Sequence, residues 1–224
     1  MLDFLKKRLS NFISTYNNIG DKVIIGKNVY LEGAEITGDV VIKDRCKVFR
    51  ARIEGVVNIN SNTSIWGPNV VINSHIYPIY IGKYCSIARN VSIQEANHKS
   101  SSITSYNIRR NIFGDKVTED MTSKGSINIG NDVWIGANSV ILSGVCIGNG
   151  VIVGAGSVVT KDIPDYAIIT GNPAQVIKYR FDKIVIEKLL EMKWWDWPID
   201  KIKNNKKLFY SDSKKEIEGL IKNH

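Results

Sequence analysis

The fold is decided by the stretch that runs from Ile129 to Val159, IGNDVWIGANSVILSGVCIGNGVIVGAGSVV. A branched aliphatic residue recurs at every sixth position of this stretch: Ile129, Ile135, Ile141, Ile147, Val153 and Val159. Three residues after each of the first five lies a residue type that tolerates left-handed backbone: Asp132, Asn138, Gly144, Gly150 and Gly156. A period of six fits neither a helix nor an ordinary strand and hairpin. It predicts a hexapeptide β-helix, in which short strands meet at tight corners and form triangular coils.

The same spacing begins earlier in the chain. It opens at Ile25-Gly26-Lys27-Asn28-Val29, slips in places, and returns at Ile81-Gly82-Lys83-Tyr84-Cys85 and Ile87-Ala88-Arg89-Asn90-Val91. One coil cannot bury its apolar residues alone, so many coils must stack. The alternative all-β fold is an antiparallel sandwich, but its strands repeat at about 8–12 residues. The sequence therefore predicts a mainly β protein with a parallel β-helix over residues 21–170.

The flanking segments and one interruption are predicted to leave the β-helix. Residues 1–20 have the apolar spacing of a helix, which either caps the end of the stack or anchors the protein at a membrane surface through its basic residues. The six-residue spacing stops over about residues 97–126, and an insertion of this length must leave the coil as an excursion loop. Residues 171–224 are predicted to form a helical extension, with one helix from Phe181 to Lys193.

Composition limits the partners and the compartment. The chain has 224 residues and a formal net charge of +8, which suits polyanionic partners or phosphorylated small molecules. No zinc-finger, helix-turn-helix or RNA-binding pattern occurs, so we expect no nucleic-acid partner. The three cysteines include Cys85 and Cys146, which we interpret as buried or wall residues of a reducing compartment. No apolar segment predicts a membrane span or a signal peptide, and we expect a cytoplasmic protein.

His98 is the candidate general base. It lies where the coil turns into the excursion loop, and an imidazole titrates near neutrality, so it can take a proton from an attacking hydroxyl or amine. Position alone leaves a structural or solvated histidine open. No G-x-S-x-G elbow, no zinc-ligand spacing and no phosphate-binding P-loop occurs, so a serine hydrolase, a metal site and a P-loop enzyme are not predicted.

Three motifs together resemble the hexapeptide-repeat acetyltransferases: Ile129-Gly130-Asn131-Asp132-Val133-Trp134-Ile135-Gly136, Glu95-Ala96-Asn97-His98 and Gly171-Asn172-Pro173-Ala174. The stretches Lys178-Tyr179-Arg180-Phe181 and Trp194-Trp195-Asp196-Trp197-Pro198-Ile199 resemble the xenobiotic branch of that family, which includes streptogramin and chloramphenicol O-acetyltransferases. The resemblance implies a left-handed parallel β-helix, which departs from the usual right-handed crossover. It also implies acetyl-CoA as co-substrate and a homotrimer whose active sites are shared between chains.

The resemblance also implies roles for particular residues. His98 matches the base that deprotonates the acceptor for direct attack on the thioester. Positions that match the acetyl-CoA site are Trp134, Gly136, Ala137, Gly154, Ala155, Thr160, Lys161, Asn172, Pro173 and Lys178. Acceptor contacts are predicted at Asn97, Tyr84 and Tyr106. Structural alternatives stay open: a tryptophan packed between subunits, glycines that the repeat itself needs, solvated lysines, and an Asn-Pro pair that only sets the turn.

Two departures from the xenobiotic branch direct the prediction of the acceptor. Extra coils precede the shared core over about residues 23–76, and the excursion Lys99-Ser100-Ser101-Ser102-Ile103-Thr104-Ser105-Tyr106 lacks a Tyr-Pro-Phe pattern. Both features look more like enzymes that acetylate a sugar or a bacterial surface polysaccharide, and this is the main prediction. The alternatives are an antibiotic O-acetyltransferase, a nucleotide-sugar N-acetyltransferase and a non-catalytic β-helix scaffold.

Overall fold

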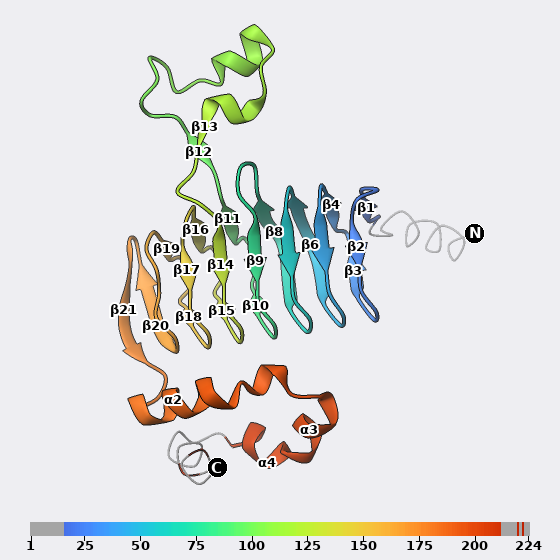
Figure 1. Ribbon diagram of the computed structural model, residues 1–224, viewed down its shortest axis with the longest axis vertical. Coiled ribbons are helices and arrows are strands. Elements are labelled where there is room, and N and C mark those ends of the chain that lie inside the picture. The colour runs from blue at the N-terminus through green and yellow to red at the C-terminus, as the bar shows by residue number, and fades with distance from the viewer. Residues whose placement is uncertain (1–15, 212–218, 220, 222–224) are drawn as a thin grey trace, which may run out of the picture.

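The structure is a computed structural model that describes residues 16–211, 219 and 221. The described chain forms a three-sided β-helix, a projecting loop and a set of C-terminal helices (Figure 1). Most of the predicted N-terminal helix lies outside the described residues. Its last part is wrong, because Asn18–Ile19 forms strand β1, which pairs in parallel with β4 (Glu35–Thr37). The first coil therefore begins before residue 21.

The strands stack in parallel into three faces, which we number in chain order around the coil. Face one holds β3 (Tyr30–Glu32), the first half of β6 (Lys47–Glu54), the first half of β8 (Ser64–Asn73), β10 (Ser86–Ile87), β15 (Trp134–Ile135), β18 (Ile152–Val153) and β20 (Ala167–Gly171). Face two holds β1, β4, the second halves of β6 and β8, β11 (Ser92–Gln94), β16 (Val140–Leu142) and β19 (Val158–Val159). Face three holds β2 (Ile24–Ile25), β5 (Val40–Ile42), β7 (Val57–Ile59), β9 (Ile79–Ile81), β14 (Ile127–Ile129) and β17 (Cys146–Ile147). The predicted β-helix is confirmed.

The six-residue period places one inward aliphatic on each face of every coil. Trp134 pairs with Ile152, eighteen residues and therefore three repeats later. The inward residues Ile65, Ile87 and Ile135 lie one above another on face one and are almost fully buried. Each such side chain contributes roughly 1.5–3 kcal/mol relative to an exposed one. Adjacent coils thus share one continuous apolar core.

The corners need left-handed backbone where the sequence predicted it. The φ angles are +58° at Asp132, +61° at Asn138 and +67° at Gly150. The corner asparagines also bind one another from coil to coil: Asn69 Nδ2 donates to Asn90 Oδ1, and Asn90 Nδ2 donates to Asn138 Oδ1. These residues turn the chain and satisfy polar groups at the edge of the stack.

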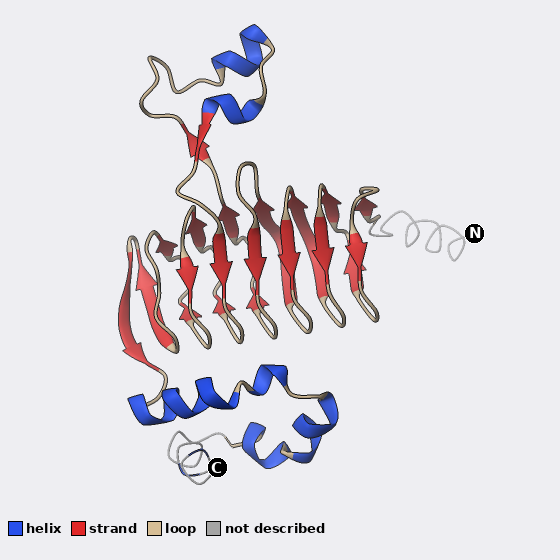
Figure 2. Cartoon of the chain, viewed as in Figure 1, coloured by secondary structure: helices blue, strands red, loops and turns tan. Residues whose placement is uncertain are grey.

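The excursion loop leaves the edge between faces two and three and projects away from the β-helix (Figures 1 and 2). Its stem is an antiparallel pair of β12 (Asn97–His98) and β13 (Met121–Thr122). Its outer part contains a π-helix, η1 (Arg109–Phe113), and a 3-10 helix, η2 (Val117–Asp120). The buried Asp120 carboxylate accepts from the backbone N–H groups of Arg109 and Arg110 and ties the two short helices together. In the structure the excursion runs from β12 to the residues before β14 (Ile127–Ile129).

Glu95 anchors the root of this loop. Its side chain is fully buried, and Oε2 accepts from the backbone N–H groups of His75 and Ile76 in the preceding coil. Its backbone carbonyl accepts from Ser123 Oγ, on the returning side of the loop. Its Oε1 is buried with no hydrogen-bond partner in the described part of the chain. One residue therefore connects the coil below with both ends of the excursion.

The C-terminal segment differs from the prediction at its start. Residues 171–182 are not helical, because β21 (Ala174–Tyr179) folds back antiparallel on β20 and extends face one. The helix begins at Lys183 instead of Phe181, since the Asp182 side chain caps it by accepting from Val185 N–H. The helices α2 (Lys183–Met192), η3 (Trp194–Asp196), α3 (Ile199–Asn204) and α4 (Lys206–Phe209) follow. They lie along the edge between faces three and one (Figure 1).

The three cysteines are free, and they do not share one environment. Cys46 and Cys85 are buried, as predicted for Cys85, but Cys146 is exposed. Cys146 sits on the outward side of face three and lines a pocket there with Tyr80 and Asn128. Within the described residues, no helix is both long enough and apolar enough to cross a membrane.

Replacing Gly55 by Ala tests the close packing of the coils. Gly55 has φ +97°, and an added Cβ would lie 1.8 Å from the Ser74 carbonyl oxygen of the next coil. The substitution should lower the free energy of unfolding by roughly 3 kcal/mol or more, since strain and overlap add. Gly156 is the matched control, because it has φ +73° with no atom within 4 Å of its Cβ position. Gly156→Ala should cost only about 1–2 kcal/mol; equal losses in urea denaturation would contradict this packing.

Replacing Glu95 by Ala should cost roughly 2 kcal/mol of unfolding free energy, because the N–H groups of His75 and Ile76 lose their acceptor. Glu95→Gln keeps an accepting oxygen and removes a buried charge, so its stability should stay close to that of the native protein. Thermal unfolding of both variants measures the difference. A loss in the Gln variant as large as in the Ala variant would show that the charge, and not the pair of hydrogen bonds, matters.

Candidate active site

His98 is exposed at the root of the excursion loop and held in one orientation. It belongs to β12, where it pairs with Met121, and its Nδ1 lies 2.7 Å from the Ser105 carbonyl oxygen. A carbonyl only accepts hydrogen bonds, so the neutral ring carries its proton on Nδ1 and donates it to Ser105. Nε2 is then left with a free lone pair. This is the tautomer that a general base requires.

The surroundings of His98 come from both ends of the loop and from the next coil. Asn97 Nδ2 donates to Ser143 Oγ at 3.2 Å, which connects the stem to the corner after β16. Lys99 Nζ donates to the Glu119 carbonyl at 2.6 Å. Tyr106 follows Ser105 directly and is largely exposed. Asn97 precedes His98, and Tyr106 follows the residue whose carbonyl binds the His98 ring, so both lie near the candidate base. Their contact with an acceptor stays a prediction.

The small residues form a second feature, at the edge between faces one and two. Gly136 and Ala137 lie beside Gly154 and Ala155, because β15 pairs with β18 and Gly156 N–H donates to the Ala137 carbonyl. A Cβ on Gly136 would lie 2.6 Å from the Ala155 backbone nitrogen, so the stacking of the coils itself requires glycine there. At Gly154 the corresponding distance is a looser 3.0 Å. We call the set Gly136, Ala137, Gly154 and Ala155 the small-residue edge.

The remaining predicted co-substrate residues are divided between two edges. Trp134 stands on the outward side of face one and is 53% exposed. Asn172 and Pro173 form the exposed turn of the β20–β21 hairpin, and Lys178 pairs with Ile168 in it. Thr160 and Lys161 follow β19, at the edge between faces two and three that also carries His98. One chain therefore holds the small-residue edge and His98 on opposite sides of face two.

Tyr84 does not lie at this site. It sits at the third edge, between faces three and one, with its ring 4.9 Å from that of Trp194. The left-handed corner, with φ +58°, turns the side chain toward the C-terminal helices, where Lys83 also pairs with Asp196 at 2.9 Å. The predicted acceptor contact at Tyr84 is corrected to a packing role.

The same third edge contains a partly buried ion pair. Arg180 Nη1 donates to Asp132 Oδ2 and to the Gly150 carbonyl, each at 2.8 Å, and its guanidinium lies over the Tyr166 ring. Burial raises the pKa of Asp132, and the charge of Arg180 offsets part of that rise. The arrangement fastens the C-terminal segment to the β-helix and is remote from His98.

A cysteine nucleophile and a metal site are the other kinds of chemistry to consider in the described residues. Burial raises the pKa of Cys85 to about 12, so this thiol is not a nucleophile at neutral pH. No group of metal-binding side chains is present in the part of the chain that the structure describes.

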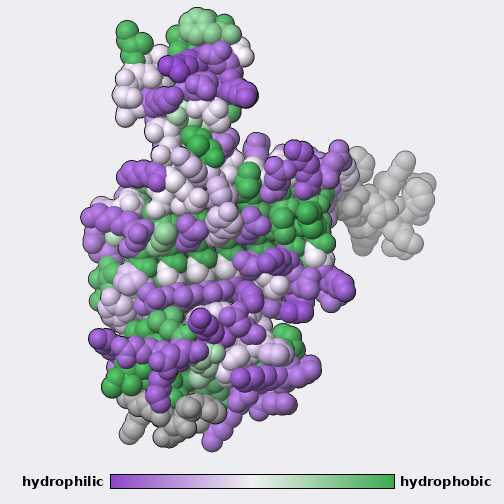
Figure 3. All heavy atoms as spheres, in the orientation of Figure 1, coloured by the Kyte–Doolittle hydropathy of each residue, from purple (hydrophilic) through white to green (hydrophobic). Residues whose placement is uncertain are grey.

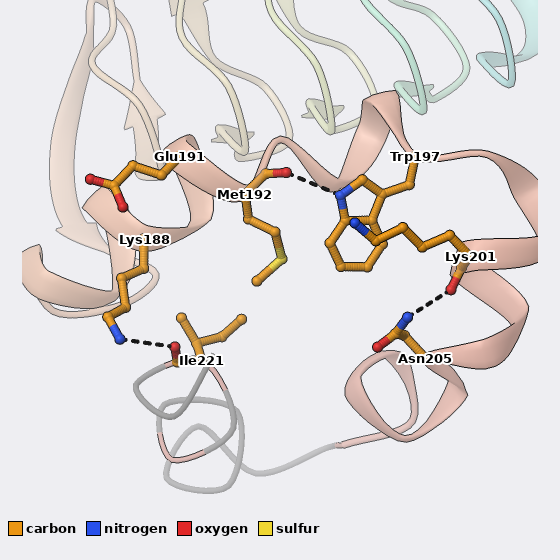
Figure 4. Close-up of a pocket in the computed structure, with 7 residues that line it drawn as sticks. All are labelled: Lys188, Glu191, Met192, Trp197, Lys201, Asn205 and Ile221. Carbon is orange, nitrogen blue, oxygen red and sulfur yellow. Dashed lines mark hydrogen bonds between the residues drawn. The ribbon is translucent and has the colours of Figure 1, made fainter.

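A cavity of about 560 Å³ lies between the C-terminal helices and is lined by Lys188, Met192, Trp197, Lys201 and Asn205 among others (Figure 4). Trp197 Nε1 donates to the Met192 carbonyl and Asn205 Nδ2 to the Lys201 carbonyl. Lys201 Nζ lies 4.0 Å from the centre of the Trp197 ring. The polar groups of Trp197 and Asn205 are thus engaged with backbone carbonyls, and none of the predicted site residues lines this cavity.

Sequence reasoning missed two parts of this region. The Ser105 carbonyl that orients His98 is a backbone atom, and no residue pattern marks it. The second part is a stack of aromatic rings on face one, Tyr30, Phe49 and Trp66. Phe49 and Trp66 pair in register but lie 17 residues apart, one short of three six-residue repeats, so the period by itself does not align them.

Comparisons with known proteins agree with the fold. A family model described as bacterial transferase hexapeptide (six repeats) matches residues 126–161. A solved structure of a variant of AntD, an N-acyltransferase from Bacillus cereus, has a TM-score of 0.53 at 24% identity and covers 84% of this chain and 96% of its own. That likeness supports the fold.

Two relatives carry the assignment further. A probable macrolide acetyltransferase from Lysinibacillus sphaericus is 44% identical over 143 residues, which cover 60% of this chain and 78% of the relative. A chloramphenicol acetyltransferase from Morganella morganii is 38% identical over 150 residues, which cover 64% of this chain and 70% of the relative. With the three-sided β-helix and the excursion loop, they show that the chain belongs to the hexapeptide-repeat acetyltransferases.

Proposed function

We propose that the protein transfers the acetyl group of acetyl-CoA to a hydroxyl group of its acceptor, with His98 as the general base. The observation that carries the proposal is the hydrogen bond between His98 Nδ1 and the Ser105 carbonyl, which leaves Nε2 free to accept a proton. The exposure of the ring at the loop root supports access by an acceptor. Direct transfer needs a base and proximity but no covalent nucleophile.

The reaction balances with this one base. Nε2 accepts the proton of the acceptor hydroxyl while the hydroxyl oxygen bonds to the thioester carbonyl carbon. The carbon–sulfur bond then breaks, and the proton held by His98 passes to the departing sulfur. The products are an acetyl ester and the free thiol of CoA. Ser105 keeps the imidazole in place through both proton transfers, because its carbonyl continues to accept from Nδ1.

The small-residue edge is the proposed position of the pantetheine arm of acetyl-CoA. Ala137 and Ala155 carry side chains that leave this edge open, and Trp134 is exposed nearby on face one. The exposed Lys161 and Lys178 and the net charge of +8 favour the phosphates of CoA. The hairpin turn at Asn172 and Pro173 continues the same edge toward the C-terminal end of the stack.

We infer that the active enzyme is a trimer that shares its sites. His98 and the small-residue edge lie on opposite sides of face two, so a complete site needs the edge of a neighbouring chain. The outer end of the excursion loop carries exposed apolar side chains, visible as green spheres in Figure 3. Ile103 is fully exposed, and Ile112 and Phe113 are 66% and 69% exposed. Apolar groups on a projecting loop favour contact with a partner, here a second copy of the chain.

Two classes of acceptor have support. The two relatives are named for a macrolide and for chloramphenicol, and they favour an antibiotic acceptor over the surface polysaccharide that was the main prediction. The second candidate is a sugar, and the observation that favours it is the exposed stack of Tyr30, Phe49 and Trp66 on the N-terminal coils. Both candidates use the same transfer to a hydroxyl.

Replacing His98 by Ala should lower kcat by roughly 10²–10⁴-fold, because the base that activates the hydroxyl is lost. The measurement is thiol release from acetyl-CoA in the presence of chloramphenicol, a macrolide, maltose and a bacterial oligosaccharide. Binding of acetyl-CoA should be unchanged in the variant, which serves as the control for folding. Near-native turnover in His98→Ala with the preferred acceptor would refute the proposed mechanism.

Mixed oligomers test the shared site. Ala155→Trp should block the small-residue edge and inactivate the enzyme while leaving His98 intact, because Ala155 is exposed and far from the loop. Neither Ala155→Trp nor His98→Ala should be active alone. When the two are refolded together, half the chains supply His98 and half their neighbours supply an open edge, so about one quarter of the sites in a trimer should recover. No recovery in a mixed oligomer that forms would place each site within one chain.

A further inference from the structure

The N-terminal coils carry a continuous stack of aromatic rings on the outside of the β-helix. Tyr30 and Phe49 have ring centres 5.4 Å apart and planes inclined by 28°. Phe49 and Trp66 are closer, at 4.8 Å and 16°. Tyr30 Oη donates to Glu32 Oε2 at 2.7 Å, which fixes the far end of the stack and raises the pKa of the phenol. A contiguous group of apolar rings on a protein surface is typical of a binding site.

The stack ends with an open ring face. Phe49 covers one face of Trp66, yet the Trp66 side chain remains 47% exposed. Ile65 pairs with Ile87, so the residue beside Trp66 in the next coil is Ala88. Its methyl group is too small to continue the stack. A flat ring fits beside Trp66 at this level, because neighbouring coils are about 4.8 Å apart.

The open face adjoins the small-residue edge. Residues in corresponding positions of successive coils form a column. Ala88 follows Ile87, and Ile87 pairs with Ile135, so Gly136 is the next residue in the column of Ala88 and Gly154 is the one after it. The outward column beside it runs through Ser64, Ser86 and Trp134. The hydroxyl groups of Ser64 and Ser86 thus flank the open face, and Trp134 bounds it on the C-terminal side. Polar groups next to an apolar face suit a ring that carries hydroxyls.

We propose that Trp66, Ser86 and Ala88 form the acceptor-binding platform, on which a ring of the acceptor stacks against the free face of Trp66. The inference rests on the proposed function, because the acetyl group arrives along the small-residue edge that begins one coil further on. The chemistry is a flat-faced ring with a hydroxyl within reach of His98 of a neighbouring chain. A sugar ring and the aromatic ring of an antibiotic both satisfy it.

The platform binds the acceptor and not the adenine of CoA. The proposed co-substrate edge runs from Gly136 toward Gly154 and the hairpin turn at Asn172, away from Trp66. Lys178 lies in that hairpin, so the positive charge for phosphates is at the end opposite to Trp66. The thioester end, which must meet the acceptor, is then the end nearest to Ala88.

Steady-state kinetics of three variants test the platform with the acceptor that turns over best. Trp66→Ala should raise the KM for the acceptor at least tenfold and leave the KM for acetyl-CoA within twofold. Trp66→Phe keeps a stacking face and should restore most of the affinity, whereas Ala88→Trp fills the position and should raise the acceptor KM as Trp66→Ala does. Tyr80→Ala, an exposed aromatic on face three, is the control and should match the native enzyme. The proposal is overturned if Trp66→Ala changes only the KM for acetyl-CoA, or changes neither KM.

Binding without turnover separates this inference from the mechanism. Saturation-transfer NMR on the full-length His98→Ala protein would use p-nitrophenyl β-glucoside, chloramphenicol and maltose as probes. Contact that disappears in His98→Ala/Trp66→Ala supports the platform, and the ring whose protons receive saturation distinguishes a sugar from an aromatic group. If no probe shows Trp66-dependent contact, the platform is refuted. If binding depends on Trp66 while His98→Ala still turns over, the platform stands and the assignment of the base fails.

Discussion

The stacking of inward aliphatic side chains is the interaction on which the rest of the structure depends. Each coil contributes one such residue to each face, and it is buried only because coils lie above and below it. Close stacking also restricts which residues the backbone of each coil can carry. At Gly136 the next coil lies so close that even a methyl group would overlap it. Outward positions, by contrast, are free of this requirement and can vary with function.

The excursion loop uses this rigid stack as a support. Glu95 lies fully buried at its root and binds the preceding coil, while its carbonyl holds the returning strand through Ser123. His98 is three residues further on, so the buried Glu95 restricts where its backbone can lie. The Ser105 carbonyl then fixes the ring orientation. Hydrogen bonds thus connect the proposed base, on an exposed loop, to the coils of the β-helix.

The outward columns divide the molecule into zones along its axis. On one column, the aromatic residues Phe49 and Trp66 precede the small residues Ala88, Gly136 and Gly154. His98 leaves the β-helix in the coil of Ala88, on the other side of face two. In the proposed trimer, the acceptor platform, the reacting groups and the co-substrate edge would follow one another along neighbouring chains. The extra coils that set this chain apart from the xenobiotic pattern supply the first of these zones.

The sequence by itself determined the β-helix, the left-handed corners, the position of the excursion and His98 as the candidate base. It did so because a period of six and the residue types at corners are local, repeated constraints that appear directly in the order of residues. The tertiary structure decided that Tyr84 packs on Trp194 and that residues 174–179 extend the sheet. It also decided that Gly136 must be glycine because the next coil lies against it. It further decided that His98 and the small-residue edge lie apart in one chain, and that Phe49 covers only one face of the Trp66 ring. These depend on which coil lies next to which and on the edge from which a side chain points, and neither is encoded within a single repeat.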